Sequence, residues 1–381
     1  MSSSVTPVYL DYNASALVRP QVQKVMAEAL ADNGNPSAIH AAGRRARARI
    51  ETARAEVAAL VGADPAAVVF SSGGTESNAQ AITSALADGC ERLIVGATEH
   101  PCVSETARVS GRPVEVLPVD ASGVIDLAVL ERLLADGPRA VVAIHQANNE
   151  SGVIQPIAEA SALVRAAGGW LHVDVVQAAG KIPVDIEALG AHTVALSAHK
   201  LGGPQGVGAL VHARGVNLSK WMQGAGQERG LRGGTENVPG IAGFGEAARL
   251  SKAEVDEGRD HAAWRDAAAA RVKAAGAIVF GEGVARLPNT LFMAAPDWPS
   301  QQQLILLDLK GVMVSAGSAC SSGKVKPSPA LTAMGVGELS QGMLRVSGGW
   351  GTTEEDWVRF ADAWTEEYAR RTARADLAGV A

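Results

Sequence analysis

Strand-like runs alternate with helix-like runs over the first 213 residues, and this alternation constrains the fold more than any other feature of the sequence. Apolar runs such as 92–98 and 140–147 are separated by longer amphipathic segments. Strands that alternate with helices are typical of an α/β protein with a mostly parallel sheet. The other strands are predicted at 67–72, 113–120, 170–177, 193–200 and 206–213, and the helices at 44–62, 75–89, 127–134 and 156–168.

The pattern changes after about residue 240. A long alanine-rich and charged segment, 241–275, is predicted to be helical, and shorter strands and a final helix at 354–374 follow it. This change indicates a separate, smaller C-terminal domain that is joined to the first by a long helix.

Composition excludes several classes of protein. A formal charge of −6, from 34 basic and 40 acidic side chains, provides no basic field for nucleic acid or for a membrane surface. Three cysteines without a CxxC pair argue against a disulfide framework and for a reducing compartment. No apolar run is as long as a membrane span, and the N-terminal residues lack a signal pattern. We therefore expect a soluble, cytoplasmic protein.

The segment FSSGGTESNAQAI, 70–82, places two glycines between a strand and a helix. Backbone N–H groups at such a helix start form an anion site, and glycine lets a phosphate approach closely. The alternative is an ordinary helix start that is capped by the side chain of Thr75.

The segment HVDVVQAAGK, 172–181, places His172 and Asp174 on the same face of a strand. A carboxylate in such an apolar run needs a partner, because an isolated buried charge is costly. A protonated heteroaromatic nitrogen would be a good partner, and the alternatives are a core arginine or an aspartate that caps a turn. A metal site built from His172, Asp174 and His199 is a further alternative.

The segment ALSAHKLGG, 195–203, ends a strand with a lysine, Lys200. This lysine either keeps its ammonium group in water or is a buried amine that forms a Schiff base with an aldehyde cofactor. Ligands bind beyond the carboxyl ends of strands in open α/β sheets. Polar residues gather at the predicted strand ends: Thr75, His100, Asn149, Asp174, Gln177 and Lys200.

The loop SAGSACSSGKVKPSP, 315–329, contains Cys320 among small residues. An exposed loop cysteine in a chain with few cysteines is a candidate nucleophile, and the alternative is an incidental thiol. Cys90 and Cys102 lie in segments predicted to be ordered, and Cys102 is close to His100 in the sequence.

Taken together, the motifs resemble the NifS/IscS-type cysteine desulfurases over nearly the whole chain. They are YLDYNASA, SSGGTESN, EHPCV, NNESGVIQPI, HVDVVQAAGK, SAHKLGGPQGVGAL, QERGLRGGTENVPGI and SAGSACSSG, in the family's order. The resemblance implies the fold type I architecture of class V aminotransferases, with a mostly parallel, seven-stranded-type sheet. It further implies a large domain over 16–250 and a smaller α+β domain, formed by 1–15 and 251–381, that carries Cys320.

The resemblance also implies how the chain binds pyridoxal 5′-phosphate (PLP). Lys200 would link covalently to the cofactor, and Asp174 would hold the pyridine nitrogen protonated. Gln177 would bond the phenolic oxygen, and His100 would stack on the ring and take part in proton transfer. The residues implied to hold phosphate are Gly74, Thr75, Ser197 and His199, together with Thr235, which would reach the phosphate of the partner subunit.

For the substrate, Arg345 and Asn149 would bind the carboxylate and a cofactor oxygen, and Cys320 would attack the sulfur of L-cysteine. Asn13 is a further expected substrate contact, although Asn13 and Ser15 depart from the family, which often has two threonines in this segment. The resemblance implies a homodimer that converts L-cysteine to L-alanine and passes a persulfide on Cys320 to an acceptor scaffold, for iron–sulfur cluster assembly or other sulfur-containing cofactors. The alternatives are a selenocysteine lyase or another class V enzyme, a metal-dependent hydrolase, and a non-enzymatic nucleotide-binding module.

Overall fold

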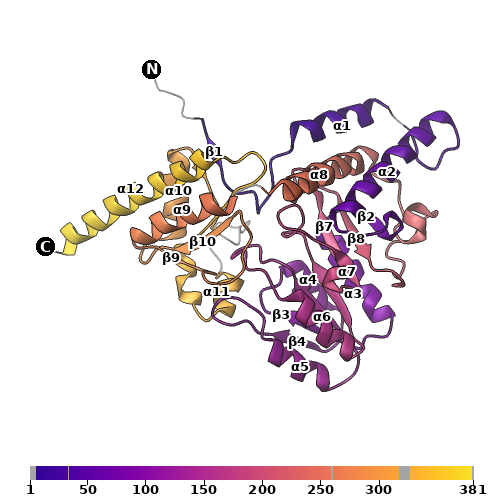
Figure 1. Cartoon of the computed structure of the whole chain (residues 1–381), viewed down its shortest axis with the longest axis horizontal. Helices are drawn as coiled ribbons and strands as arrows, with labels where there is room; N and C mark the ends of the chain where they lie inside the picture. Colours follow the sequence, from indigo (N-terminus) through magenta and orange to yellow (C-terminus); the bar gives the residue numbers. More distant parts are fainter. Residues whose placement is uncertain (1–5, 33, 259–260, 317–326, 380–381) are drawn as a thin grey trace.

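The computed structural model describes residues 6–32, 34–258, 261–316 and 327–379. Within these residues, seven strands form one large sheet in the order β2-β8-β7-β6-β5-β3-β4 (Figure 1). Neighbouring strands are parallel except at β8, which is antiparallel to both β2 and β7. The strands are β2 (Val68–Ser71), β3 (Arg92–Gly96), β4 (Val114–Leu117), β5 (Ala140–His145), β6 (Trp170–Asp174), β7 (Thr193–Ser197) and β8 (Gly208–His212). The predicted mostly parallel sheet is confirmed.

Helices cover both faces of this sheet, because alternate side chains of each central strand enter opposite hydrophobic cores. Ile94 and Val142 pack in one core, whereas their neighbours Leu93 and Val141 pack in the other. The first core also contains residues of α2 (Ala41–Leu60), α5 (Leu127–Ala135), α6 (Ile157–Ala166), α7 (Ile186–Leu189) and α8 (Val238–Glu257). The second contains residues of α3 (Gly74–Ala87) and α4 (Pro101–Val109).

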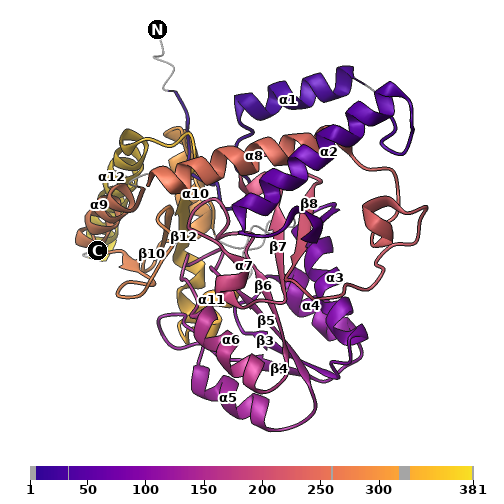
Figure 2. The same cartoon turned by 45° about the vertical axis from the view of Figure 1, so that its right-hand side comes forward.

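A smaller sheet and its helices form a separate layer beside the large sheet (Figures 1 and 2). Its strands are antiparallel in the order β12-β10-β9: β12 (Met343–Ser347), β10 (Thr290–Ala294) and β9 (Ile278–Val279). Its core also holds residues from α9 (His261–Ala274), α10 (Ser300–Leu309) and α12 (Glu354–Gly379). The start of the chain joins this layer, since β1 (Val8–Tyr9) pairs in parallel with β11 (Val312–Met313). The remaining helices are α1 (Pro20–Ala31) and α11 (Pro329–Ala333).

The helix predicted over 241–275 is instead two helices. The first of them, α8, ends at Glu257, where Gly258 adopts the left-handed conformation with φ 69° and donates its N–H to Val255 O. A left-handed glycine after the last turn is a common helix stop. The second, α9, starts at His261 and packs in the core of the smaller layer, whereas α8 packs against α1 and α2.

Candidate active site

A cavity of about 560 Å³ lies at the carboxyl edge of the large sheet. This volume suits a cofactor together with a small substrate. Most residues predicted for the site line it: Asn13, Gly74, Thr75, His100, Asn149, Asp174, Gln177, Ser197, His199, Lys200 and Arg345. Thr235 lines a different cavity, of about 80 Å³, beside Arg232 and Glu236. Cys320 lies outside the described residues.

Lys200 ends a short 3₁₀ turn, Ala198–Lys200, that follows β7. Its Nζ donates hydrogen bonds to Asn13 O at 2.6 Å and to Ala14 O at 2.8 Å. Burial, followed by the nearby Arg345 guanidinium, lowers the pKa of Lys200 to about 8. The neutral, nucleophilic form of the amine is therefore well populated near physiological pH.

Asp174 is the last residue of β6, and its buried carboxylate is held by N–H donors. Asn78 Nδ2 donates to Oδ2 at 2.8 Å, and the Val176 backbone N–H donates to Oδ1 at 2.9 Å. Asn78 comes from α3, so the packing of this helix on the sheet fixes the carboxylate. No arginine among the described residues is hydrogen-bonded to Asp174, so the core-arginine alternative is wrong. The bond from Val176 confirms that the carboxylate caps the turn after β6, through Oδ1.

His172, which was one possible metal ligand, is a buried member of the same network. Its Nε2 lies 2.7 Å from Asn78 Oδ1, and its Nδ1 lies 2.9 Å from Thr193 Oγ1. Burial lowers the pKa of His172 to about 4, so the ring is neutral and both nitrogens are used within the protein. His172 therefore positions Asn78, and through it Asp174, rather than facing a metal ion.

The first turn of α3 forms the side of the cavity nearest to Gly74 and Thr75. The residue before the helix is Gly73, not Thr75, and no side chain among the described residues caps it. Gly73 has φ 156°, a conformation that residues with a side chain rarely adopt. Gly208 packs closely against it, since a Cβ on Gly208 would lie 2.6 Å from Gly73 Cα. The alternative in which Thr75 caps the helix is therefore wrong, and the backbone N–H groups of this turn remain for an anion.

Glu76, the acidic residue in this turn, does not repel an anion in the cavity, because its carboxylate is bound to groups outside the cavity. Its Oε2 accepts from the Ser72 backbone N–H at 2.7 Å, and its Oε1 pairs with Arg232 Nε at 2.9 Å. Ser197 and His199 line the same cavity from the end of β7. Hydroxyl, imidazole and backbone N–H groups thus face one region that can hold a phosphate.

His100 and Cys102 occupy the start of α4 at the cavity wall. The Cys102 backbone N–H donates to His100 Nδ1 at 3.1 Å, which leaves the proton of a neutral imidazole on Nε2. Burial lowers the pKa of His100, so the neutral form prevails. Burial also raises the pKa of Cys102 to about 12, so this cysteine is a thiol and a poor nucleophile at neutral pH.

Arg345 extends from β12 of the smaller sheet into the same cavity. It donates to Asp11 Oδ1 at 2.8 Å and to Asn149 O at 3.1 Å. Its buried Nε has no hydrogen-bond partner among the described residues. Arg345 is therefore held in place and retains a donor for an anionic ligand.

Asn13 lines the cavity, but its side-chain amide is used within the protein. Its Nδ2 donates to Thr290 Oγ1 at 2.9 Å, and its Oδ1 accepts from Lys181 Nζ at 2.8 Å. The backbone oxygen of Asn13 accepts from Lys200. Asn13 thus holds the lysine through its backbone, and both ends of its side-chain amide are bound to protein groups rather than left for a substrate.

Sequence reasoning missed several residues that organise the site. They are Asp11, Asn78 and Lys181, none of which is predicted above as a site residue. Each lies inside one of the quoted motifs, YLDYNASA, SSGGTESN or HVDVVQAAGK, but the motif does not indicate the distant residue that it contacts.

Comparisons with known proteins point to one family. The model of the family described as aminotransferase class-V matches residues 8–360. The cysteine desulfurase IscS of Dictyoglomus turgidum is 39% identical over 360 residues, which is 92% of this chain and 91% of the relative. A solved NifS-like protein from Rickettsia africae superposes with a TM-score of 0.88 at 33% identity, over 95% of this chain and 99% of that one. The structure described as SspA in complex with cysteine has a TM-score of 0.77 at 30% identity, over 89% and 98% of the two chains.

Proposed function

The chain belongs to the class V aminotransferase family and is a PLP-dependent cysteine desulfurase, and from this premise we propose that Lys200 binds the cofactor covalently and that Cys320 receives the sulfur. One observation carries the proposal: the Lys200 amine, the Asp174 carboxylate and the uncapped start of α3 line a single cavity. An amine, a carboxylate and an anion site are the groups that an aldehyde, a pyridine nitrogen and a phosphate need.

The residues present fit the cofactor. Asp174 would face the pyridine nitrogen, Gln177 the phenolic oxygen, and His100 the ring. The proposed phosphate ligands are Gly74, Thr75, Ser197 and His199. When bound, PLP supplies an electron sink that stabilises negative charge on the carbon next to the substrate amino group.

The side chains of the cavity divide the binding and proton-transfer tasks. Arg345, which keeps a free Nε donor, binds the carboxylate of L-cysteine, with Asn149 beside it. Lys200 Nζ, neutral in a large fraction of molecules near pH 8, takes the proton from the substrate α-carbon. His100 Nε2 exchanges a proton with the substrate at the cavity wall.

The sulfur-transfer step requires a thiolate, and we assign it to Cys320. Its Sγ forms an S–S bond to the substrate sulfur while the C–S bond of the substrate breaks. The electron pair of the C–S bond stays on the substrate carbon, which takes up a proton, so the products are L-alanine and a persulfide on Cys320. No further oxidant or reductant is needed.

The described residues on either side of the Cys320 segment line the cavity or are bonded to a residue that lines it. Ser315 forms a pair of backbone hydrogen bonds with Arg345, at 2.7 and 3.1 Å. On the other side, Pro327 and Pro329 line the cavity wall, and Ser328 donates to the buried Glu150. This placement of both ends supports delivery of Cys320 to the substrate.

We further propose a cytoplasmic homodimer with a large domain over 16–250 and a small domain over 1–15 and 251–381. The pairing of β1 with β11 supports this division. Thr235, which is exposed and lines a different cavity from the cofactor site, would reach the phosphate of the partner subunit. The persulfide would pass to a scaffold for iron–sulfur cluster assembly. None of the described helices is long and apolar enough to span a membrane.

Mass spectrometry of the intact protein after exposure to L-cysteine tests the sulfur-transfer proposal. We expect the mass of one extra sulfur atom, located on the peptide that contains Cys320, and its loss in Cys320→Ser. Cys102→Ser is the matched control, because its thiol lines the cofactor cavity but has a raised pKa. Persulfide that persists in Cys320→Ser and disappears in Cys102→Ser would reverse the assignment.

A further inference from the structure

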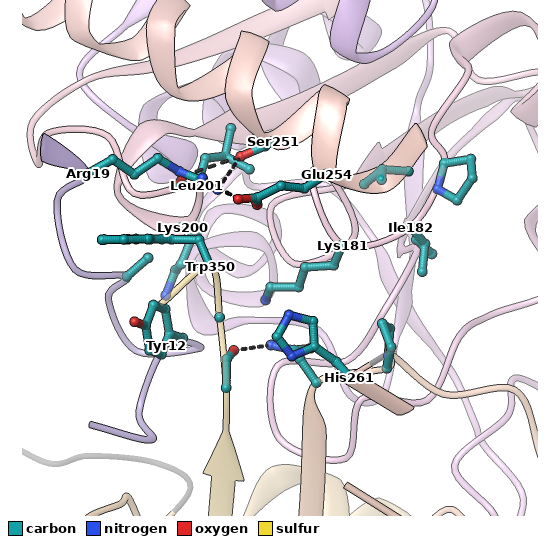
Figure 3. Close-up of a pocket in the computed structure, with 18 of the residues that line it drawn as sticks. Tyr12, Arg19, Lys181, Ile182, Lys200, Leu201, Ser251, Glu254, His261 and Trp350 are labelled. Carbon is teal, nitrogen blue, oxygen red and sulfur yellow. Dashed lines mark hydrogen bonds and ion pairs between the residues drawn. The ribbon is translucent and has the colours of Figure 1, made fainter. Parts of the chain in front are cut away.

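Lys181 is a second lysine close to the active site for which the reaction described above has no use. It lies in the turn that follows Gly180 and shares with Lys200 the wall of another cavity, of about 150 Å³ (Figure 3). Lys200 lines both this cavity and the cofactor site, whereas Lys181 reaches the cofactor site only through its hydrogen-bond partners.

The Lys181 ammonium or amine group is bound to two acceptors that belong to different segments. Nζ donates to Gln177 Oε1 at 2.6 Å and to Asn13 Oδ1 at 2.8 Å. Burial, followed by the nearby Lys200 and Arg345, holds the pKa of Lys181 well below its usual range. A neutral amine has two N–H bonds, which match these two acceptors without adding a charge next to Lys200.

The contact with Gln177 determines which end of its amide faces the cofactor site. The oxygen and nitrogen ends of a glutamine amide have nearly the same shape, so hydrogen-bond partners decide its orientation. Lys181 donates, so it holds Oε1, and Nε2 is left to donate to Asn13 O at 3.0 Å. Nε2 carries a second hydrogen, and Gln177 lines the cofactor cavity.

We propose that Lys181 is a positioning residue that orients the Gln177 amide so that its N–H group faces the phenolic oxygen of the cofactor. This inference rests on the proposed function, because it requires PLP beside Gln177. Lys181 does not touch the cofactor in this account and acts through Gln177.

The same lysine holds the resting place of Lys200 through Asn13. Asn13 is 1% exposed, and its backbone oxygen accepts from both Gln177 Nε2 and Lys200 Nζ. With its Oδ1 bound to Lys181, Asn13 links the two lysines and the glutamine into one network. Loss of Lys181 would therefore free Oε1 of Gln177, whereas the Asn13 amide would keep its hydrogen bonds to Thr290 and Asn289.

A double-mutant cycle with Lys181→Met and Gln177→Ala tests the inference. The measurements are the dissociation constant of PLP from the apoprotein, by quenching of tryptophan fluorescence, and the pH midpoint of the visible absorption band of the bound cofactor. We expect each single variant to weaken PLP binding about 3- to 10-fold, the size of one misdirected hydrogen bond. The double variant should bind no more than about twofold more weakly than Gln177→Ala, because Lys181 acts through Gln177.

The spectrum separates a positioning role from a merely structural one. Both single variants should shift the pH midpoint of the band in the same direction, and the double variant should shift it no further. Lys252→Met, on the exposed side of α8, is the matched control and should leave both measurements unchanged. If Lys181→Met does not fold, Lys181→Gln, which keeps an N–H₂ donor, should still show the weaker binding and the spectral shift to a smaller extent.

Two results would overturn the inference: an unchanged band midpoint in the Lys181 variant, or losses of affinity that multiply in the double variant. A failure of the proposed function would give a different result from either of these. The apoprotein without substitutions would then not bind PLP, and there would be no dissociation constant with which to compare the Lys181 variant.

Discussion

The reactivity of Lys200 toward PLP should depend on pH with a midpoint of about 8. Burial, with Arg345 as the second cause, lowers the pKa of this amine from 10.5 to about 8. At pH 7 about one Lys200 side chain in eleven is then neutral, compared with about one in three thousand at the ordinary pKa. The environment therefore raises the concentration of the attacking amine about 300-fold at this pH.

Stopped-flow absorbance with apoprotein and excess PLP measures this reactivity directly. Because only the neutral amine attacks, the rate constant should rise about tenfold per pH unit below the midpoint and level off above it. The same reaction with a free lysine derivative corrects for ionisation of PLP itself. Arg345→Gln should move the midpoint upward, since a neighbouring positive charge is lost. The matched control Arg359→Gln, on α12, should not.

A rate constant that keeps rising to about pH 10, as it does for the free amine, would refute this reasoning. It would mean that Lys200 is solvated as an ordinary surface lysine. An unchanged midpoint in Arg345→Gln would leave burial as the cause and remove Arg345 from the explanation.

Two further outcomes follow from the buried ionic groups. Asp174→Asn should slow sulfide release from L-cysteine by about 100-fold or more, because the ring nitrogen of PLP loses its charged partner. Steady-state kinetics at saturating PLP measure this rate, and near-normal turnover would contradict the role of Asp174. Arg54→Met should lower the free energy of unfolding of the apoprotein by about 3–5 kcal/mol, because it leaves the buried Glu228 without the two 2.8 Å bonds from Arg54. Urea unfolding measures this loss, and Arg54→Met with Glu228→Gln should recover part of it.

Much of the large sheet could be predicted from the sequence, because its central strands are apolar runs buried on both faces. All six residues of β5 are buried, for example. The end of α8 could not be predicted in the same way. Alanine-rich helical sequence lies on both sides of Gly258, and a single glycine inside such a pattern is compatible with a continuous helix.

The part of the site that follows from strand ends was also predictable. Asp174 ends β6 and Lys200 closely follows β7, and the carboxyl ends of these two neighbouring parallel strands share one edge of the sheet. The supporting residues were not predictable, because their partners are distant in the chain: Asn78 contacts Asp174 across 96 positions, and Arg345 contacts Asp11 across 334. No local spacing reports such contacts. The first exists only after α3 has packed on the large sheet, and the second only after the start of the chain has joined the smaller layer.

Borohydride reduction of the holoprotein, followed by peptide mapping, tests the central claim most directly, because it converts the bond between protein and cofactor into a stable label. The expected result is a pyridoxyl group on Lys200, with none on the neighbouring Lys181. A label on Lys181, or a holoprotein whose cofactor is lost without labelling any lysine, would contradict the assignment of Lys200 as the cofactor-binding amine.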